Sequence, residues 1–152
     1  VSFNQPLNSW DTQNVKNMER MFSGAISFNQ SLNSWNTQSV TEMSGMFSDA
    51  ISFNQPLNSW NTQSVTEMSR MFDYAVSFNQ DISDWNIQKV EFMHEMFKNA
   101  TSFNYDIISA WRSSLTENLE TDGMFENADT FCSEKYTCGQ SNQNPFSEFV
   151  SN

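Results

Sequence analysis

The sequence predicts an α/β solenoid, a stack of 25-residue coils that each contain one short parallel strand and one short helix. Three observations lead to this fold class. A Phe-Asn pair recurs every 25 residues, a Trp follows seven residues after each of the first four of these Phe residues, and a Met-Phe-x-x-Ala block ends the first four units. A tandem repeat of this length is typical of a solenoid, because one unit cannot cover its own apolar side chains and stacked neighbours can.

The two halves of each unit predict different local structure. In the first unit the apolar positions between Val15 and Ala25 step by three or four residues, which is the spacing of one face of a short α or 3₁₀ helix. The stretch from Pro6 to Trp10 is too short to diagnose by period, but its composition is compatible with an extended strand. Stacking such strands in parallel gives the sheet of the predicted solenoid.

The chain divides into a repeat region and a closing segment. Residues 1–128 form the predicted five-coil solenoid, whose last coil is irregular because Trp111 comes one residue late and 28 residues separate Phe103 from Phe131. Residues 129–152 are predicted to be a C-terminal cap, since a terminal coil needs an outer surface unlike that of the inner ones. The first coil begins in mid-pattern with no such segment before it, so we expect the N-terminal end of the stack to be bare.

Composition limits the partners. The chain of 152 residues has a formal net charge of −11, which would repel a nucleic-acid backbone. No stretch reaches the roughly 18 apolar residues that span a bilayer, so no membrane insertion by this segment is expected. The two cysteines, Cys132 and Cys138, predict a small disulfide-closed loop and with it an extracellular setting; two free thiols are the alternative.

The most regular polar residue is the Asn that follows the first Phe of every unit. Because it recurs in every coil directly after an apolar residue of the predicted core, we expect it to satisfy backbone groups and to stack into a ladder along the solenoid. The predicted structural ladder consists of Asn4, Asn29, Asn54, Asn79 and Asn104.

Variation among the units gathers in the predicted helix half, whereas the strand half hardly changes across the first four units. A surface that recognises one irregular protein would be expected to differ in sequence from coil to coil. A uniform polar face suits a periodic partner, such as a glycan, a mineral lattice or a copy of the same protein. The predicted interaction face consists of Asn8, Asn33, Asn58, Gln13, Gln38 and Gln63.

No catalytic or metal site is predicted, and no cofactor. His94 is the single histidine, so neither a catalytic triad nor a His-ligated zinc site can be built. The Met pairs at helical spacing beside Phe predict core packing rather than copper ligation. Acidic residues such as Asp81, Asp84 and Asp106 lack the dense alternation of a calcium loop and predict solvated surface charge.

The repeat resembles a known family. The run V-x-x-M-x-x-M-F-x-x-A-x-x-F-N-Q-x-L-x-x-W, present four times with few changes, looks like the 26-residue bacterial surface-protein repeat of mycoplasma and Listeria lipoproteins. That family is usually placed beside the BspA-like leucine-rich repeats. The resemblance covers residues 1 to about 128, and it implies a leucine-rich-repeat-like solenoid on a cell surface, with no catalytic residues to carry over.

The sequence therefore predicts a non-catalytic, extracellular or cell-surface repeat module for structural assembly or adhesion. The most specific version of this prediction is self-association into a filament. The expected partner is the protein itself, another surface protein or a carbohydrate. The alternative is a ligand-binding module that recognises a glycan or host protein through its uniform polar face. Two sequons, at Asn29 and Asn99, would permit N-glycosylation in a eukaryotic source.

Overall fold

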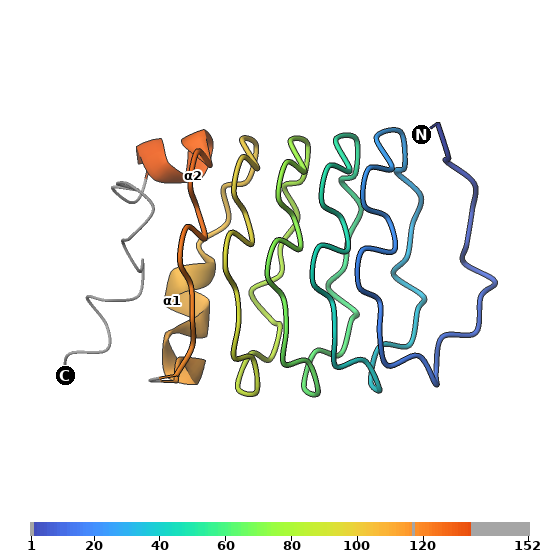
Figure 1. The fold of residues 1–152 in the computed structure, drawn as a ribbon, viewed down its shortest axis with the longest axis horizontal. Coiled ribbons are helices and arrows are strands. Elements are labelled where there is room, and N and C mark those ends of the chain that lie inside the picture. The colour runs from blue at the N-terminus through green and yellow to red at the C-terminus, as the bar shows by residue number, and fades with distance from the viewer. Residues whose placement is uncertain (1, 117, 135–152) are drawn as a thin grey trace.

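Successive turns of the chain lie over one another along a single axis (Figure 1). The computed structural model describes residues 2–116 and 118–134. The first coil forms one end of the stack, and the two short α-helices lie toward the other end (Figure 1). Equivalent aromatic rings of neighbouring coils are stacked, as in the Phe28–Phe53 pair, whose centroids are 6.0 Å apart. The step from one coil to the next is therefore the 25-residue period of the sequence.

The predicted α/β solenoid of strand-and-helix coils is wrong, as is its leucine-rich-repeat-like detail. In the described part of the chain the helices are α1 (Ile107–Trp111), the 3₁₀ helix η1 (Arg112–Ser114) and α2 (Asp129–Glu134), and all three lie in or after the fifth coil. No named strand or sheet is present there. Among the described residues, β-type pairing between coils consists of isolated parallel bridges, Asn17 with Glu42, Glu42 with Glu67, Glu67 with Phe92 and Phe92 with Glu120.

Consecutive turns replace the predicted helix. In the first coil the N–H groups of Met21, Ser23 and Ala25 each donate to a carbonyl three residues earlier, at 3.0–3.3 Å. The N–H groups of the residues between them donate to the next coil instead, as from Phe22 to the Met46 carbonyl at 2.9 Å. Each of these turns spans from residue i to residue i−3, so a run of them can place apolar residues three or four apart without the i to i−4 bonds of a helix.

Left-handed backbone conformations also exclude a helix here. Two positions in each repeat have positive φ, first at Arg20 and Gly24 and then at Gly45 and Asp49. A left-handed residue is strained for most L-amino acids, and a helix does not continue through one. The same two positions carry positive φ in the later coils at Arg70, Tyr74, Glu95, Asn99, Gly123 and Asn127.

The predicted strand half consists of turns as well. The Trp10 N–H donates to the Leu7 carbonyl at 3.1 Å, and the Val15 N–H donates to the Thr12 carbonyl at 3.0 Å. Side chains then join this half to the next coil: the Thr12 hydroxyl donates to the Asn36 carbonyl at 3.1 Å, and the Trp35 indole Nε1 donates to the Leu7 carbonyl at 3.0 Å. Because side chains provide these links, no backbone ladder forms and no sheet results.

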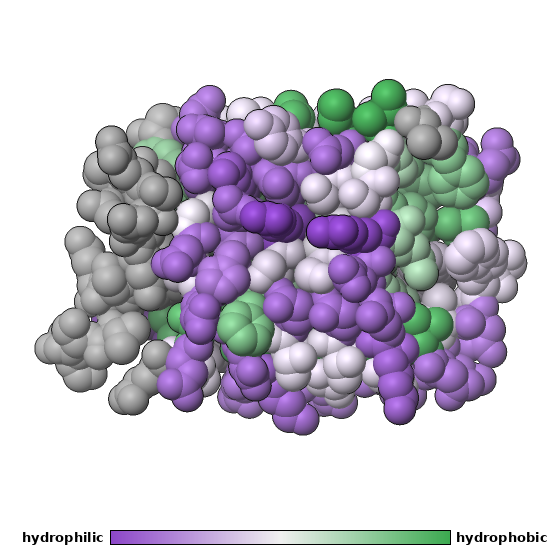
Figure 2. Space-filling view, viewed as in Figure 1, coloured by the Kyte–Doolittle hydropathy of each residue, from purple (hydrophilic) through white to green (hydrophobic). Residues whose placement is uncertain are grey.

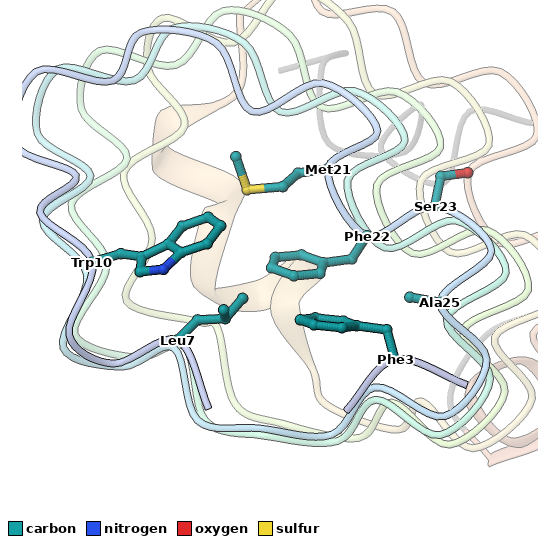
Figure 3. A pocket seen from close by; sticks show the side chains of 7 residues that line it. All are labelled: Phe3, Leu7, Trp10, Met21, Phe22, Ser23 and Ala25. Atoms are coloured by element: carbon teal, nitrogen blue, oxygen red, sulfur yellow. The ribbon is translucent and has the colours of Figure 1, made fainter. Parts of the chain in front are cut away.

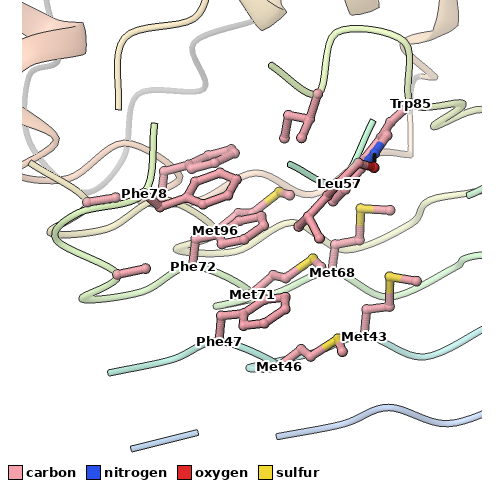
Figure 4. Packing of buried hydrophobic residues seen from close by; sticks show 14 of the residues in the cluster. Met43, Met46, Phe47, Leu57, Met68, Met71, Phe72, Phe78, Trp85 and Met96 are labelled. Carbon is pink, nitrogen blue, oxygen red and sulfur yellow. Dashed lines mark hydrogen bonds between the residues drawn. The ribbon is translucent and has the colours of Figure 1, made fainter. Parts of the chain in front are cut away.

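The core is a set of stacked apolar columns. One column of Phe rings runs from Phe22 through Phe47 and Phe72 to Phe97, with centroids 5.5–5.6 Å apart. Figure 4 shows Met43, Met46, Met68 and Met71 from two successive coils beside these rings, and all four are buried. Each inner coil therefore shares its apolar surface with the coils on both sides, and the burial of this surface supplies the main stabilising free energy of the stack.

The fifth coil departs from the others where the sequence does. Helix α1 begins after Asp106, whose carboxylate accepts from the Ser109 N–H at 3.1 Å, and the helix buries Ile107, Ile108 and Trp111. The disulfide expected between Cys132 and Cys138 falls partly outside the described residues, because Cys138 is not among them. Most of the expected cap, residues 135–152, also lies outside them.

Candidate interaction surfaces

The Asn of the predicted ladder lies in the same place in every coil. Its Oδ1 accepts from the backbone N–H of the equivalent Asn one coil later, at 2.9 Å from Asn29 to Asn4 and at 3.0 Å from Asn54 to Asn29. The same contact joins Asn79 to Asn54 and Asn104 to Asn79, at 2.9 and 3.0 Å. These side chains satisfy backbone donors between coils, so substituting one of them affects the stack itself.

The following Gln reinforces this row. The Nε2 of Gln30 donates to the Asn4 Oδ1 at 3.0 Å, and Gln55 and Gln80 make the same bond one and two coils later, at 3.1 and 2.8 Å. The oxygens of Asn4, Asn29 and Asn54 therefore each accept two hydrogen bonds from the next coil. This row is part of the scaffold rather than a surface left available for a partner.

The predicted interaction face is more open. Gln13, Gln38 and Gln63 are all exposed, and their backbone N–H groups are held by the side chain two residues earlier, for example by Asn61 in the third coil at 3.1 Å. In the Asn row, Asn8 and Asn58 are exposed and Asn33 is half-buried, with its Nδ2 donating to the Asn58 Oδ1 at 3.3 Å. The structure thus places both rows at the surface, one carboxamide per coil in each row.

A charged cluster occupies the turn half of coils three to five. Glu95 contacts Arg70 and Lys98 at 2.6 and 2.7 Å, and Lys98 also contacts Glu126 at 3.2 Å. The hydrogen bond from Lys98, with Arg70 beside it, holds the pKa of Glu95 below its usual value, and Glu95 and Glu126 raise the pKa of Lys98. This arrangement pairs opposite charges across three coils.

Asp73 lies next to this cluster in a less favourable place. Burial raises the pKa of Asp73, and the like charges of Glu95 and Asp49 add to the effect, although Asn99 donates to its carboxylate at 3.4 Å. The charged form of Asp73 is thus disfavoured in the folded chain.

The remaining candidate residues do not form a chemical site. His94 contacts Glu120 at 3.1 Å on the surface. Across the described residues no group of three or more His, Cys, Asp and Glu side chains is placed to hold a metal ion. The three inner Met pairs, in coils two to four, are buried in the core. Asp81 uses its carboxylate to accept from the Ser83 N–H at 3.0 Å, which lowers the pKa of Asp81.

The N-terminal end of the stack exposes apolar side chains. Phe3 is 38% exposed, Met21 40% and Trp10 54%, whereas the side chains at the same positions in the third coil are all buried, namely Phe53, Met71 and Trp60. Figure 3 shows these side chains and Leu7 around a hollow of about 280 Å³ that opens at this end. In Figure 2, too, hydrophobic side chains gather near this end of an otherwise largely hydrophilic face.

Backbone carbonyls follow the same edge. In inner coils the carbonyls of four alternate residues accept from the preceding coil, as at Glu42, Ser44, Met46 and Ser48, with distances of 2.8–2.9 Å. Within the described residues, no hydrogen bond reaches the carbonyls at the same four positions of the first coil, Asn17, Glu19, Met21 and Ser23. The sequence predicted a bare end, but not this row of acceptors.

Comparison with known proteins identifies the family. Residues 1–73 and 33–138 match the family described as "Mycoplasma protein of unknown function, DUF285". The chain belongs to this family. No curated protein and no solved structure matches it. Membership in DUF285 agrees with the resemblance to mycoplasma surface repeats, whereas nothing in the comparisons supports the relation to BspA-like leucine-rich repeats.

Two further features of this DUF285 chain bear on its surroundings. No helix in the described residues is long and apolar enough to cross a membrane. Of the sequon residues, Asn29 is exposed and belongs to the Asn row, while Asn99 is half-buried with positive φ and contacts Asp73 and Asn127. N-glycosylation at either residue stays a prediction.

Proposed function

We propose that the chain is a non-catalytic, extracellular or cell-surface repeat module that serves in structural assembly or adhesion. The observation that carries this proposal is the uniform polar surface of the coils, on which Gln13, Gln38 and Gln63 are all exposed, with one carboxamide in each coil. A carboxamide both donates and accepts hydrogen bonds, so a matching row on a second copy, or another regular surface, can pair with this one.

The surroundings we propose follow from the surface chemistry. A net charge of −11 and rows of uncharged carboxamides keep the rest of the molecule hydrated. The resemblance to mycoplasma and Listeria surface repeats points to the same location. The partner is then another surface protein or a second copy of the chain, and repeated contacts between copies would give a filament.

Sedimentation velocity tests the assembly role. The full chain is expected to form species larger than a monomer as its concentration rises, and Gln38→Glu/Gln63→Glu is expected to suppress them by placing like charges in the exposed Gln row. Ile26→Glu/Ile51→Glu is the matched control, because both Ile residues are exposed but lie outside this row. A chain that stays monomeric at every concentration, with no other surface protein bound in an adhesion assay, would contradict the proposal.

The alternative is a ligand-binding module for a glycan or host protein, and the exposed Gln row favours it. A carboxamide both donates and accepts hydrogen bonds, as sugar hydroxyls do, and Gln13, Gln38 and Gln63 present one per coil. A glycan array probed with the chain is the test. Binding lost in the Gln38→Glu/Gln63→Glu variant, but kept in Ile26→Glu/Ile51→Glu on the opposite side of the coil, would favour the alternative over the assembly role.

A further inference from the structure

One edge of the stack carries no net charge. It consists of the Gln row and the residues on either side of that row in coils one to four, and we call it the Gln edge; its residues are 11–16, 36–41, 61–66 and 86–91. The whole chain has a formal net charge of −11, but the charged residues of the Gln edge are Asp11, Lys16, Lys89 and Glu91, whose charges cancel. Two copies of so acidic a chain therefore repel each other least where their Gln edges face one another.

The charged side chains lie toward the two ends of this edge. The first coil holds Asp11 and Lys16 and the fourth holds Lys89 and Glu91, whereas the second and third coils hold no charged residue there. All four side chains are exposed, and none of them takes part in an ion pair within the described residues. By contrast, both cations of the charged cluster in the turn half are paired with glutamates. The Gln edge thus leaves its charges available to a partner.

The uncharged middle of the edge can pair with a copy of itself. Gln38 and Gln63 are exposed, and their carboxamides make no hydrogen bond within the described part of the chain, although their backbone N–H groups are held. A carboxamide donates through its nitrogen and accepts through its oxygen, so it is complementary to a second carboxamide. The middle of the edge therefore suits a two-fold contact, in which both copies use the same surface.

The charged ends decide the direction of the second copy. When the two stacks run in opposite directions, the second coil of one copy faces the third coil of the other, and the first faces the fourth. Lys16 then lies opposite Glu91 of the second copy, because Glu91 follows Lys16 by three whole repeats. When the stacks run in the same direction, each coil faces its own equivalent, so the two Lys89 residues meet and Lys16 does not meet Glu91. The antiparallel arrangement sets opposite charges against each other at both ends.

We propose that two copies of the chain associate through their Gln edges in antiparallel orientation, with Gln38 against Gln63 and Lys16 against Glu91 of the second copy. The inference rests on the assembly role above and specifies its partner, surface and direction. Both copies use the same surface, so the contact closes at two copies. One edge is small beside the interface of a stable dimer, so we expect an association that depends on concentration.

Two charge reversals in the full chain test the orientation. Lys16→Glu sets two glutamates against each other at both ends of the pair, and Glu91→Lys sets two lysines against each other there. Each variant alone is expected to associate about tenfold more weakly than the unmodified chain in sedimentation velocity. An equimolar mixture of the two variants is expected to regain the association, because each end of a mixed pair then holds one lysine and one glutamate.

Net charge provides the control. Glu91→Lys makes the chain less acidic, which by general repulsion alone would strengthen association, whereas the antiparallel pair requires weaker association. Glu19→Lys and Arg20→Glu change the net charge by the same amounts as the two reversals, at exposed residues outside the Gln edge. These controls should leave the association constant within about twofold of the unmodified chain.

The outcomes separate this inference from the assembly role. If both reversals leave association unchanged, or if the mixture fails to regain it, the antiparallel pair is overturned while assembly through another surface is retained. If the unmodified chain stays monomeric at every concentration, both the assembly role and the pair fail. A glycan bound by such a monomer through the Gln row would then assign this edge to the alternative function.

Discussion

The first and third coils have nearly the same sequence but different surroundings. Phe3, Trp10 and Met21 are exposed, whereas Phe53, Trp60 and Met71 are buried. The neighbouring coils make this difference, since the third coil is covered on both sides and the first on one side only. Burial in this fold is thus a property of position in the stack, and the same substitution should have a different effect in each coil.

The largest contrast is expected between two Phe residues at the same position of the repeat, Phe53 in the third coil and Phe3 in the first. Phe53 stacks on Phe28, Phe47 and Phe78, so Phe53→Ala leaves a cavity and should lower the free energy of unfolding by about 3–5 kcal/mol. Phe3→Ala should lower it by only about 1 kcal/mol, because Phe3 is covered on one side. Urea unfolding of both variants measures the difference. Equal losses would show that the end coil is covered in solution.

A smaller contrast is expected for the indoles. Trp60→Phe keeps most of the ring area but removes the hydrogen bond to the Leu32 carbonyl, which should cost about 1–3 kcal/mol because that carbonyl becomes unpaired. Trp10→Phe should change the free energy of unfolding by less than about 0.5 kcal/mol. Thermal unfolding followed by circular dichroism compares them. A large loss for Trp10→Phe would mean that its indole has a partner at the end of the stack.

Substitutions at two glycines distinguish the cost of backbone strain from the cost of a close contact between coils. Gly24 and Gly45 both have positive φ, so Ala at either should cost about 1 kcal/mol in strain. A Cβ at Gly24 meets nothing within 4 Å, whereas a Cβ at Gly45 would lie 3.1 Å from Arg20 Cγ in the preceding coil. Gly45→Ala should therefore lose more stability in urea unfolding. Equal losses would indicate that the Arg20 side chain moves aside without cost.

The smallest effect concerns a buried charge. The pKa of Asp73 is raised by burial, so Asp73→Asn should stabilise the chain at pH 7 by a few tenths to about 1 kcal/mol. The pKa of Asp73 is higher in the folded chain than in the unfolded chain. Asp73 therefore destabilises the fold fully above the folded-state pKa, and this destabilisation fades as the pH falls, until both states bind the proton below the usual value of 3.8. Unfolding measured from pH 7 to pH 3 checks this trend.

A carboxylate in the first coil provides the control for this pH series. Asp11 is exposed and accepts from the Gln13 N–H, a bond that Asn36 makes in the same way to Gln38 one coil later. Asp11→Asn should therefore stay within about 0.5 kcal/mol of the unmodified chain. A gain for Asp73→Asn that persists at pH 3 would assign the effect to packing rather than to charge.

The sequence was sufficient to find the step of the stack and the residues of its core. The recurrence of Phe, Trp and Met-Phe at 25 residues requires equivalent side chains to meet, and a Phe-Asn pair in every unit indicated a polar row next to an apolar column. These features depend only on which residues repeat.

Local structure could not be read in the same way. A spacing of three and four residues fits consecutive turns as well as a helix, and only the left-handed positions distinguish them. The sequence carries a partial signal, since Gly24, Gly45, Asp49, Asn99 and Gly123 occupy those positions. Arg70, Tyr74 and Glu95 conceal it, because these residue types rarely adopt positive φ. The row of unbonded carbonyls has no sequence signal, as every residue has a carbonyl.

The Asn row has a consequence for how genes of this kind change length. The partners of each Asn lie in the neighbouring unit at fixed positions, so an in-frame duplication or loss of a whole unit leaves every remaining bond with a partner of the same kind. Insertion of a part of a unit would move the amides, indoles and left-handed residues out of alignment, and the longer fifth coil forms helices where the other coils have turns. Recombination between repeats can therefore lengthen or shorten such a protein by whole coils without changing the contacts between them.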